Sequence, residues 1–163
     1  MDEVLREKEE NMLMEKAIDT LNDLFQLNND RIEGYEKALE NTEEDDLKAL
    51  FSNFINTRRK CNQELSGEIK ALGGTPVERT KTSGKFFRAW IDVRAALSGN
   101  ERKAVFDSFV FGEEKAIESY KNVLGDDIEY LNSEQQTLLG AQLDSLRNDY
   151  NKVKSMRDAL VEA

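Results

Sequence analysis

The strongest constraint in this sequence is helical periodicity: four long segments place apolar residues three and four positions apart, and strand-like alternation is missing. The segments cover 14–41, 43–72, the stretch from after Gly99 to Leu124, and 133–161. Helices of about 25–30 residues would each span roughly 40 Å. The pattern therefore predicts an all-α protein built from four long helices.

The connections between these segments predict the topology. The first two segments are joined by a short turn, and so are the last two. The middle connection begins at Gly73-Gly74 and has about 27 residues, enough to return along the whole length of the helices. Two antiparallel hairpins joined by one long crossover form the ferritin-like arrangement of a four-helix bundle.

Turn and cap residues refine this picture. We expect a short amphipathic helix over 85–97 inside the crossover. Capping boxes are predicted to start at Thr42, Ser98 and Ser133. Residues 14–163 should form one domain, preceded by a charged lead at 1–13 that is either a frayed tail or an extension of the first helix.

Composition removes several kinds of chemistry. The chain of 163 residues has no His, so the commonest metal ligand and the usual general base are both missing. The single cysteine, Cys61, cannot form an internal disulfide and is expected to be a small buried apolar residue in a reducing compartment. No Gly-rich phosphate loop is present, and no His could activate a Ser or Cys nucleophile. We expect no enzyme activity and no cofactor.

Charge and hydropathy limit the partners. The net charge of −10 disfavours binding to nucleic acid and to anionic membrane surfaces. No apolar run approaches the length of about 18 residues that would indicate a membrane span. The charged N-terminal stretch lacks the apolar region of a signal peptide, so we expect a cytoplasmic protein.

One polar residue interrupts each apolar stripe near its midpoint, and in an antiparallel bundle the midpoints share one level. These residues are Asn28, Arg58, Glu113 and Asp149. A buried guanidinium needs a carboxylate partner, for which Glu113 is the first candidate and Asp149 the second. We therefore predict a salt-bridged polar layer in the middle of the bundle.

Tyrosines and carboxylates surround this predicted layer. Tyr35, Tyr120 and Tyr150 should bury their rings and hydrogen-bond their hydroxyls. The segments 33–39 and 118–124 also match weakly, which places Tyr35 and Tyr120 in corresponding positions of the two hairpins. Gly112 falls inside a helix, where close helix approach is its plainest role.

An alternative for the same region is a metal site made only of carboxylates. Oxygen ligands of this kind suit hard cations. The candidates are Glu33, Glu36, Glu64, Glu68, Glu113, Glu114 and Glu118. A small-molecule or partner role for the polar layer also remains open, and most of these glutamates would otherwise lie on solvated helix faces.

The crossover carries the most conspicuous aromatic residues. Phe86, Phe87 and Trp90 fall on the apolar side of the predicted helix at 85–97. They either seal one side of the bundle or form a surface for homo-oligomerisation.

Three stretches resemble a known family. Residues 29–38 (NDRIEGYEKA), 84–97 (GKFFRAWIDVRAAL) and 112–116 (GEEKA) are similar to an uncharacterised bacterial family of ferritin-like four-helix-bundle proteins, a domain of unknown function. The resemblance covers about residues 15–161 and implies a ferritin-like fold without an established activity. Members of this family often carry His where this chain has Phe87 and Asn148, which makes a metal or acid–base role less expected here.

The sequence thus favours a non-enzymatic helical bundle that acts through interaction or self-association, with a stress-related role as one option. The alternative is a carboxylate-only metal-binding or oxidative ferritin-like protein.

Overall fold

The computed structural model describes residues 2–78, 93–97, 99 and 101–162. It has four long helices, α1 (Glu3–Glu40), α2 (Asp45–Ala71), α4 (Arg102–Asp126) and α5 (Ser133–Glu162). A short 3-10 helix, η1 (Ile128–Tyr130), lies between α4 and α5, and residues 93–97 are helical. No strand occurs in these described ranges, which confirms the predicted all-α class.

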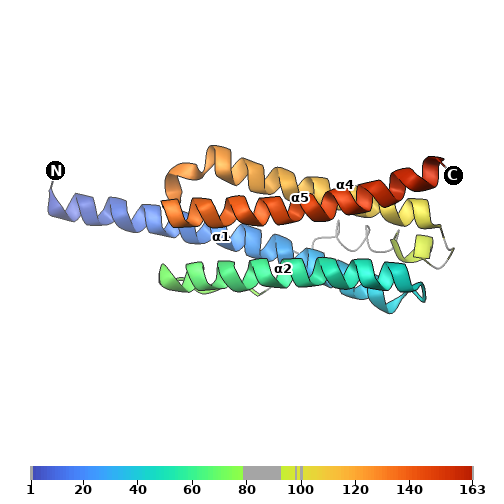
Figure 1. Cartoon of the computed structure of the whole chain (residues 1–163). Coiled ribbons are helices and arrows are strands. Elements are labelled where there is room, and N and C mark those ends of the chain that lie inside the picture. Colours follow the sequence, from blue (N-terminus) through green and yellow to red (C-terminus); the bar gives the residue numbers. More distant parts are fainter. Residues whose placement is uncertain (1, 79–92, 98, 100, 163) are drawn as a thin grey trace.

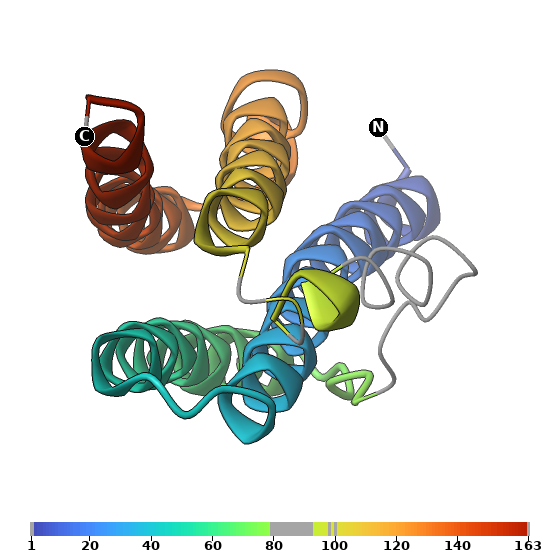
Figure 2. The same ribbon diagram turned by 90° about the vertical axis from the view of Figure 1, so that its right-hand side faces the viewer.

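The four long helices lie side by side along one axis (Figure 1). α1 packs chiefly against α2, and α4 packs chiefly against α5, so the chain forms two hairpins. α2 also contacts α5 and α1 contacts α4, which closes the arrangement seen end-on in Figure 2. α1 and α5 run in one direction while α2 and α4 run in the other (Figure 1). α2 therefore ends far from the start of α4, and residues 93–97 lie near that start.

α1 is longer than the periodicity predicted. It begins at Glu3 instead of residue 14, and the Asp2 carboxylate accepts a hydrogen bond from the Val4 N–H at 3.2 Å as an N-terminal cap. Residues 2–16 are exposed, and this part of α1 projects beyond the other helices (Figure 1). The charged lead is therefore an extension of the first helix, not a frayed tail.

The end of α2 follows from its glycines. Gly73 has φ +87°, a left-handed conformation that favours glycine. The Gly73 N–H donates to the Lys70 carbonyl and the Gly74 N–H to the Ile69 carbonyl, both at 2.9 Å. This pair of bonds forms a Schellman motif, which satisfies carbonyls left free at the helix end.

Two of the predicted capping boxes differ in detail. At α2 the helix begins at Asp45 after Glu44, and the Thr42 hydroxyl accepts from the Glu44 N–H at 3.3 Å instead of capping the helix. At α5 the reciprocal box belongs to Asn132 and Gln135, whose side chains accept from each other's N–H at 2.8 and 3.0 Å. The cap is therefore one residue earlier than predicted, because an amide can play the part assigned to a hydroxyl. Ser98, the third predicted cap, lies outside the described residues.

The buried side chains form two apolar clusters, one towards each end of the helices. The first is mainly aliphatic, with Leu21, Leu65, Ile69 and Leu139 among its members. The second contains five aromatic residues: Tyr35, Phe51, Phe54, Phe106 and Phe109. Cys61 is buried in the first cluster, as expected. The polar layer described below lies where the two clusters meet.

Two further expectations concern the crossover and membranes. Phe86, Phe87 and Trp90 lie outside the described residues, so the predicted seal or oligomer surface stays a prediction. At 93–97, the final turn of the predicted helix, Val93 and Ala96 are buried in the aromatic cluster. None of the described helices combines the length and apolar content needed to cross a membrane.

Candidate functional site

The structure buries all four residues of the predicted polar layer. Asn28, Arg58 and Glu113 have no exposed surface, and Asp149 is 7% exposed. They come from α1, α2, α4 and α5 in turn, so one residue of the layer lies on each long helix. The first three form a connected network, whereas Asp149 does not join it through an ion pair.

Arg58 connects three helices. One terminal nitrogen donates to Asn28 Oδ1 at 2.7 Å, and the other forms an ion pair with Glu113 Oε2. Removing two charges from water is costly unless each is paired and hydrogen-bonded. Here each charge has the other as its partner, which lets both stay ionised inside the protein.

The second oxygen of Glu113 is also fully used. Tyr35 donates its hydroxyl to Glu113 Oε1, and Arg31 approaches the same oxygen at 3.1 Å. Burial raises the pKa of Glu113, but the adjacent cations Arg58 and Arg31 outweigh it and hold the pKa below the ordinary 4.5. Burial likewise raises the pKa of the Tyr35 hydroxyl well above 10.0. Glu113 is therefore a carboxylate, and Tyr35 a neutral donor.

The sequence did not single out Arg31, yet it completes this part of the layer. Its guanidinium also contacts the Tyr35 hydroxyl at 2.6 Å and lies over the Tyr35 ring. Its side chain is 20% exposed, so it links the buried carboxylate to the surface. The sequence does hint at this position, because Arg31 lies four residues before Tyr35 and seven before Ala38 and so falls beside the apolar stripe of α1. We call Arg31, Tyr35, Arg58 and Glu113 the charged half of the layer.

Gly112 makes room for Arg31. A Cβ atom built on Gly112 would overlap the Arg31 guanidinium: the distance from this Cβ to Arg31 Nη2 would be only 2.8 Å. The absence of a side chain at Gly112 thus lets Arg31 of α1 pass the surface of α4 and reach Glu113. This is a more specific reason than the close helix approach that the sequence suggested.

The rest of the layer is neutral. Asn28 donates to the Tyr120 hydroxyl at 2.9 Å, and Tyr120 donates to Gln142 Oε1 at 2.8 Å. Gln142 in turn donates to the backbone carbonyl of Cys61 at 3.1 Å and to Glu64 at 3.3 Å. Burial raises the pKa of the Tyr120 hydroxyl, which keeps it protonated. We call Asn28, Tyr120 and Gln142 the neutral half.

Gln142 was overlooked as a member of the layer although it stands in the apolar stripe of α5. It is 2% exposed, and its amide connects α5 to both α2 and α4. The signal was present, because Gln142 interrupts that stripe as Asp149 does one heptad later. Tyr150, by contrast, is only partly buried and donates its hydroxyl to Glu114 at the surface at 2.8 Å.

Asp149 has a different environment from Glu113. No cation among the described residues forms an ion pair with it, and its Oδ2 is buried without a hydrogen-bond partner. Burial is the main reason that its pKa rises from 3.8 to about 6. Both Arg58 and Arg31 pair with Glu113 instead. Asp149, the second candidate partner of Arg58, thus lies at the same level of the bundle but forms no ion pair with Arg58.

The six other carboxylates proposed as metal ligands are engaged separately or lie apart. Glu114 and Glu118 are exposed, and Glu33, Glu36, Glu64 and Glu68 are partly exposed. The ion pairs Glu36–Arg59 at 2.5 Å, Glu118–Lys115 at 3.5 Å and Glu33–Lys37 at 3.8 Å are typical of helix surfaces. Within the described part of the chain, no three His, Cys, Asp or Glu side chains are grouped so that they could hold a metal ion.

Cys61 is not arranged for nucleophilic chemistry. Burial raises the pKa of its thiol to about 11, whereas a reactive cysteine needs a lowered value. It fills space in the aliphatic cluster beside the neutral half.

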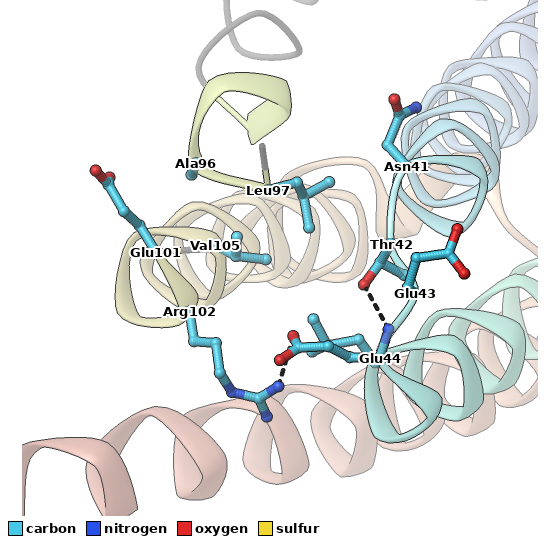
Figure 3. A pocket seen from close by; sticks show the side chains of 10 residues that line it. Asn41, Thr42, Glu43, Glu44, Ala96, Leu97, Glu101, Arg102 and Val105 are labelled. Atoms are coloured by element: carbon cyan, nitrogen blue, oxygen red, sulfur yellow. Dashed lines mark hydrogen bonds and ion pairs between the residues drawn. The ribbon is translucent and has the colours of Figure 1, made fainter. Parts of the chain in front are cut away.

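A pocket of about 200 Å³ opens at the end of the molecule where α2 and α4 begin (Figure 3). Its lining includes the apolar side chains of Leu47, Leu97 and Val105 and the acidic side chains of Glu43 and Glu101. Arg102 also lines the pocket, and its guanidinium forms ion pairs with Glu44 at 2.7 Å and Asp46 at 2.5 Å. Arg102 is therefore paired, and the described lining residues offer no other cation; the pocket is also remote from the polar layer.

Comparison with known proteins gives a family but no described activity. No curated protein matches the chain. A family model described as a domain of unknown function (DUF2383) matches residues 16–126. This range is shorter than the 15–161 expected from the resemblance; it contains the charged half and ends with α4, before Gln142 and Asp149. Because the match spans more than half of the sequence, the chain belongs to the DUF2383 family.

Proposed function

We propose that this chain is a non-enzymatic, ferritin-like four-helix bundle in which a buried ion pair replaces a central metal site. The helix directions support the ferritin-like topology, since two antiparallel hairpins with α2 and α4 parallel require one long crossover. In ferritin-like di-metal proteins the carboxylates of the bundle core bind metal. Here the central carboxylate, Glu113, binds Arg58 instead.

The observation that carries the proposal is that both oxygens of Glu113 are already occupied. Oε2 pairs with Arg58, and Oε1 accepts from Tyr35 and Arg31. A metal bound there would have to displace two guanidinium groups and would then lie beside positive charge. The layer is thus suited to joining helices, and the protein would act through its surface, by interaction or self-association.

Metal analysis of protein purified without chelators tests this proposal. We expect substoichiometric Fe, Mn and Zn in the wild type, in Glu113→Gln and in the surface control Glu33→Gln. Stoichiometric metal in the wild type that is lost in Glu113→Gln and kept in Glu33→Gln would overturn the proposal and support the carboxylate-only metal site.

The mode of action is tested by the mass of the particle in solution. The exposed start of α1 carries Val4, Leu5, Met12 and Leu13, each about half exposed, which supports an interaction role for this segment. Light scattering of the wild type and of Leu5→Glu/Met12→Glu should differ if the segment mediates self-association. Identical monomer masses over the whole concentration range would leave interaction with another protein as the role to test. The cytoplasmic location also remains a proposal, supported by the single Cys61.

A further inference from the structure

Asp149 is a buried carboxyl group that the polar network does not use. It is 7% exposed, it lies on α5 at the level of Arg58, and its Oδ2 has no hydrogen-bond partner. A buried carboxylate without a cation is expensive, whereas its protonated form is neutral and tolerates an apolar environment.

The cation that faces Asp149 from α2 pairs with Glu113 instead. From α2, Arg58 has both terminal nitrogens committed to Asn28 and Glu113, and its Nε has no partner. Cys61 and the Thr57 hydroxyl also approach from α2. Thr57 donates to the Asn53 carbonyl at 3.1 Å, and its hydrogen bonding to Asp149 lowers the pKa of that carboxyl, although burial raises the pKa by more.

Charges on the other helices add little stabilisation. Glu113 on α4 is a carboxylate and repels a second negative charge, while Lys152 on α5 itself is exposed and offsets this only weakly. Glu113 and Asp149 therefore compete for one cation, and Glu113 holds it.

We propose that Asp149 is a proton-dependent lock between α5 and α2: it holds a proton in the tightly packed state, and losing that proton loosens α5. The lock concerns the contact between the hairpins, because α2 belongs to the first and α5 to the second. It does not depend on the proposed function, since it requires neither a metal nor a partner.

The direction of the pH effect follows from the pKa of Asp149. Burial raises that pKa from 3.8 to about 6, so the folded protein binds a proton that the unfolded chain has released. Stabilisation is complete below pH 3.8 and is lost as the pH rises through about 6. Between about pH 5 and pH 7.5, this one group should raise the unfolding equilibrium constant on the order of tenfold.

The test compares denaturant unfolding at these two pH values in the wild type, Asp149→Asn and Asp144→Asn. Asp144 is a matched control on α5, with a side chain 75% exposed. Between the two pH values, the unfolding equilibrium constant should rise about tenfold more in the wild type and in Asp144→Asn than in Asp149→Asn. Hydrogen exchange should accelerate in α5 at the higher pH in the first two proteins only.

Direct titration provides a second measurement that does not depend on a variant. The NMR signal of the Asp149 carboxyl carbon should titrate near pH 6 in the folded protein. A midpoint near 3.8, or an unchanged pH response in Asp149→Asn, would overturn the proposal.

Discussion

The charged and neutral halves of the polar layer perform the same task with different chemistry. Both connect helices from the two hairpins at the level where the apolar clusters meet. The charged half does so with an ion pair whose members cannot be left alone inside the protein, and the neutral half with amide and hydroxyl groups. Asn28 joins the two, since it accepts from Arg58 and donates to Tyr120.

The two tyrosines make the comparison concrete. Tyr35 and Tyr120 each lie on the first helix of a hairpin, and neither has any exposed surface. The Tyr35 ring packs among Phe51, Phe54 and Phe109, and its hydroxyl reaches a carboxylate. The Tyr120 ring belongs to the aliphatic cluster, and its hydroxyl lies between two amides. A buried tyrosine thus contributes to each half, so we expect the cost of a mutation to depend on which half it disrupts.

The largest effect is expected from breaking the ion pair. Arg58→Ala should lower the free energy of unfolding by about 3–5 kcal/mol, because it leaves Glu113 buried with only the partly exposed Arg31 as a cation. Chemical denaturation followed by circular dichroism measures this change.

Arg59 is the control for that prediction. Its side chain is 57% exposed and pairs with Glu36 at the surface. Arg59→Ala should change the free energy of unfolding by less than about 0.5 kcal/mol. Equal effects of the two substitutions would contradict the central role of Arg58.

A smaller effect is expected in the neutral half. Tyr120→Phe removes the hydroxyl that pairs Asn28 with Gln142 and leaves both amides short of a partner. The expected loss is about 2 kcal/mol, since each unsatisfied buried group costs on the order of 1–3 kcal/mol before relaxation. The same melts measure it, and a cost equal to that of Arg58→Ala would remove the distinction between the halves.

Gly112→Ala should have a smaller net effect than Arg58→Ala or Tyr120→Phe, and its sign is informative. The new methyl group would displace the Arg31 guanidinium from Glu113, although Ala is the better helix former. We expect a net destabilisation of about 1 kcal/mol, from charge-assisted bonds worth about 1.5–3 kcal/mol less the gain in helix propensity.

Gly140→Ala is the matched control, because a Cβ atom there meets nothing within 4 Å. It should stabilise the protein by up to about 1 kcal/mol through helix propensity. Two Gly→Ala changes in helix interiors with opposite signs would show that Arg31 contributes to the charged half. Stabilisation by both would argue against it.

The all-α class and the helix pairs could be predicted because periodicity and loop length act locally. The length of α1 could not be predicted, since residues 3–13 lack an apolar stripe. These residues continue the helix that begins to pack against the rest of the protein at Ala17. The Asn132–Gln135 box was missed for a related reason: hydroxyl and amide caps are close in preference, so the sequence allows both.

The membership of the polar layer was partly readable from interruptions of the stripes. That pattern pointed to Asn28, Arg58 and Glu113, and the structure joins these three. It could not identify Arg31, because Arg31 reaches the layer from the flank of α1 through the space left by Gly112. Nor could it foresee that Asp149 stays unpaired, since partner choice depends on three-dimensional approach.

The directions of the four long helices have an electrostatic consequence. Each helix has a positive end at its N-terminus and a negative end at its C-terminus. In this arrangement every pair of neighbours (α1 with α2, α4 with α5, α2 with α5 and α1 with α4) runs antiparallel. Apart from the projecting start of α1, unlike ends therefore adjoin and the macrodipoles largely oppose one another. Arg102 places a further positive charge at the positive start of α4, and the carboxylates of Glu44 and Asp46 at the start of α2 neutralise it.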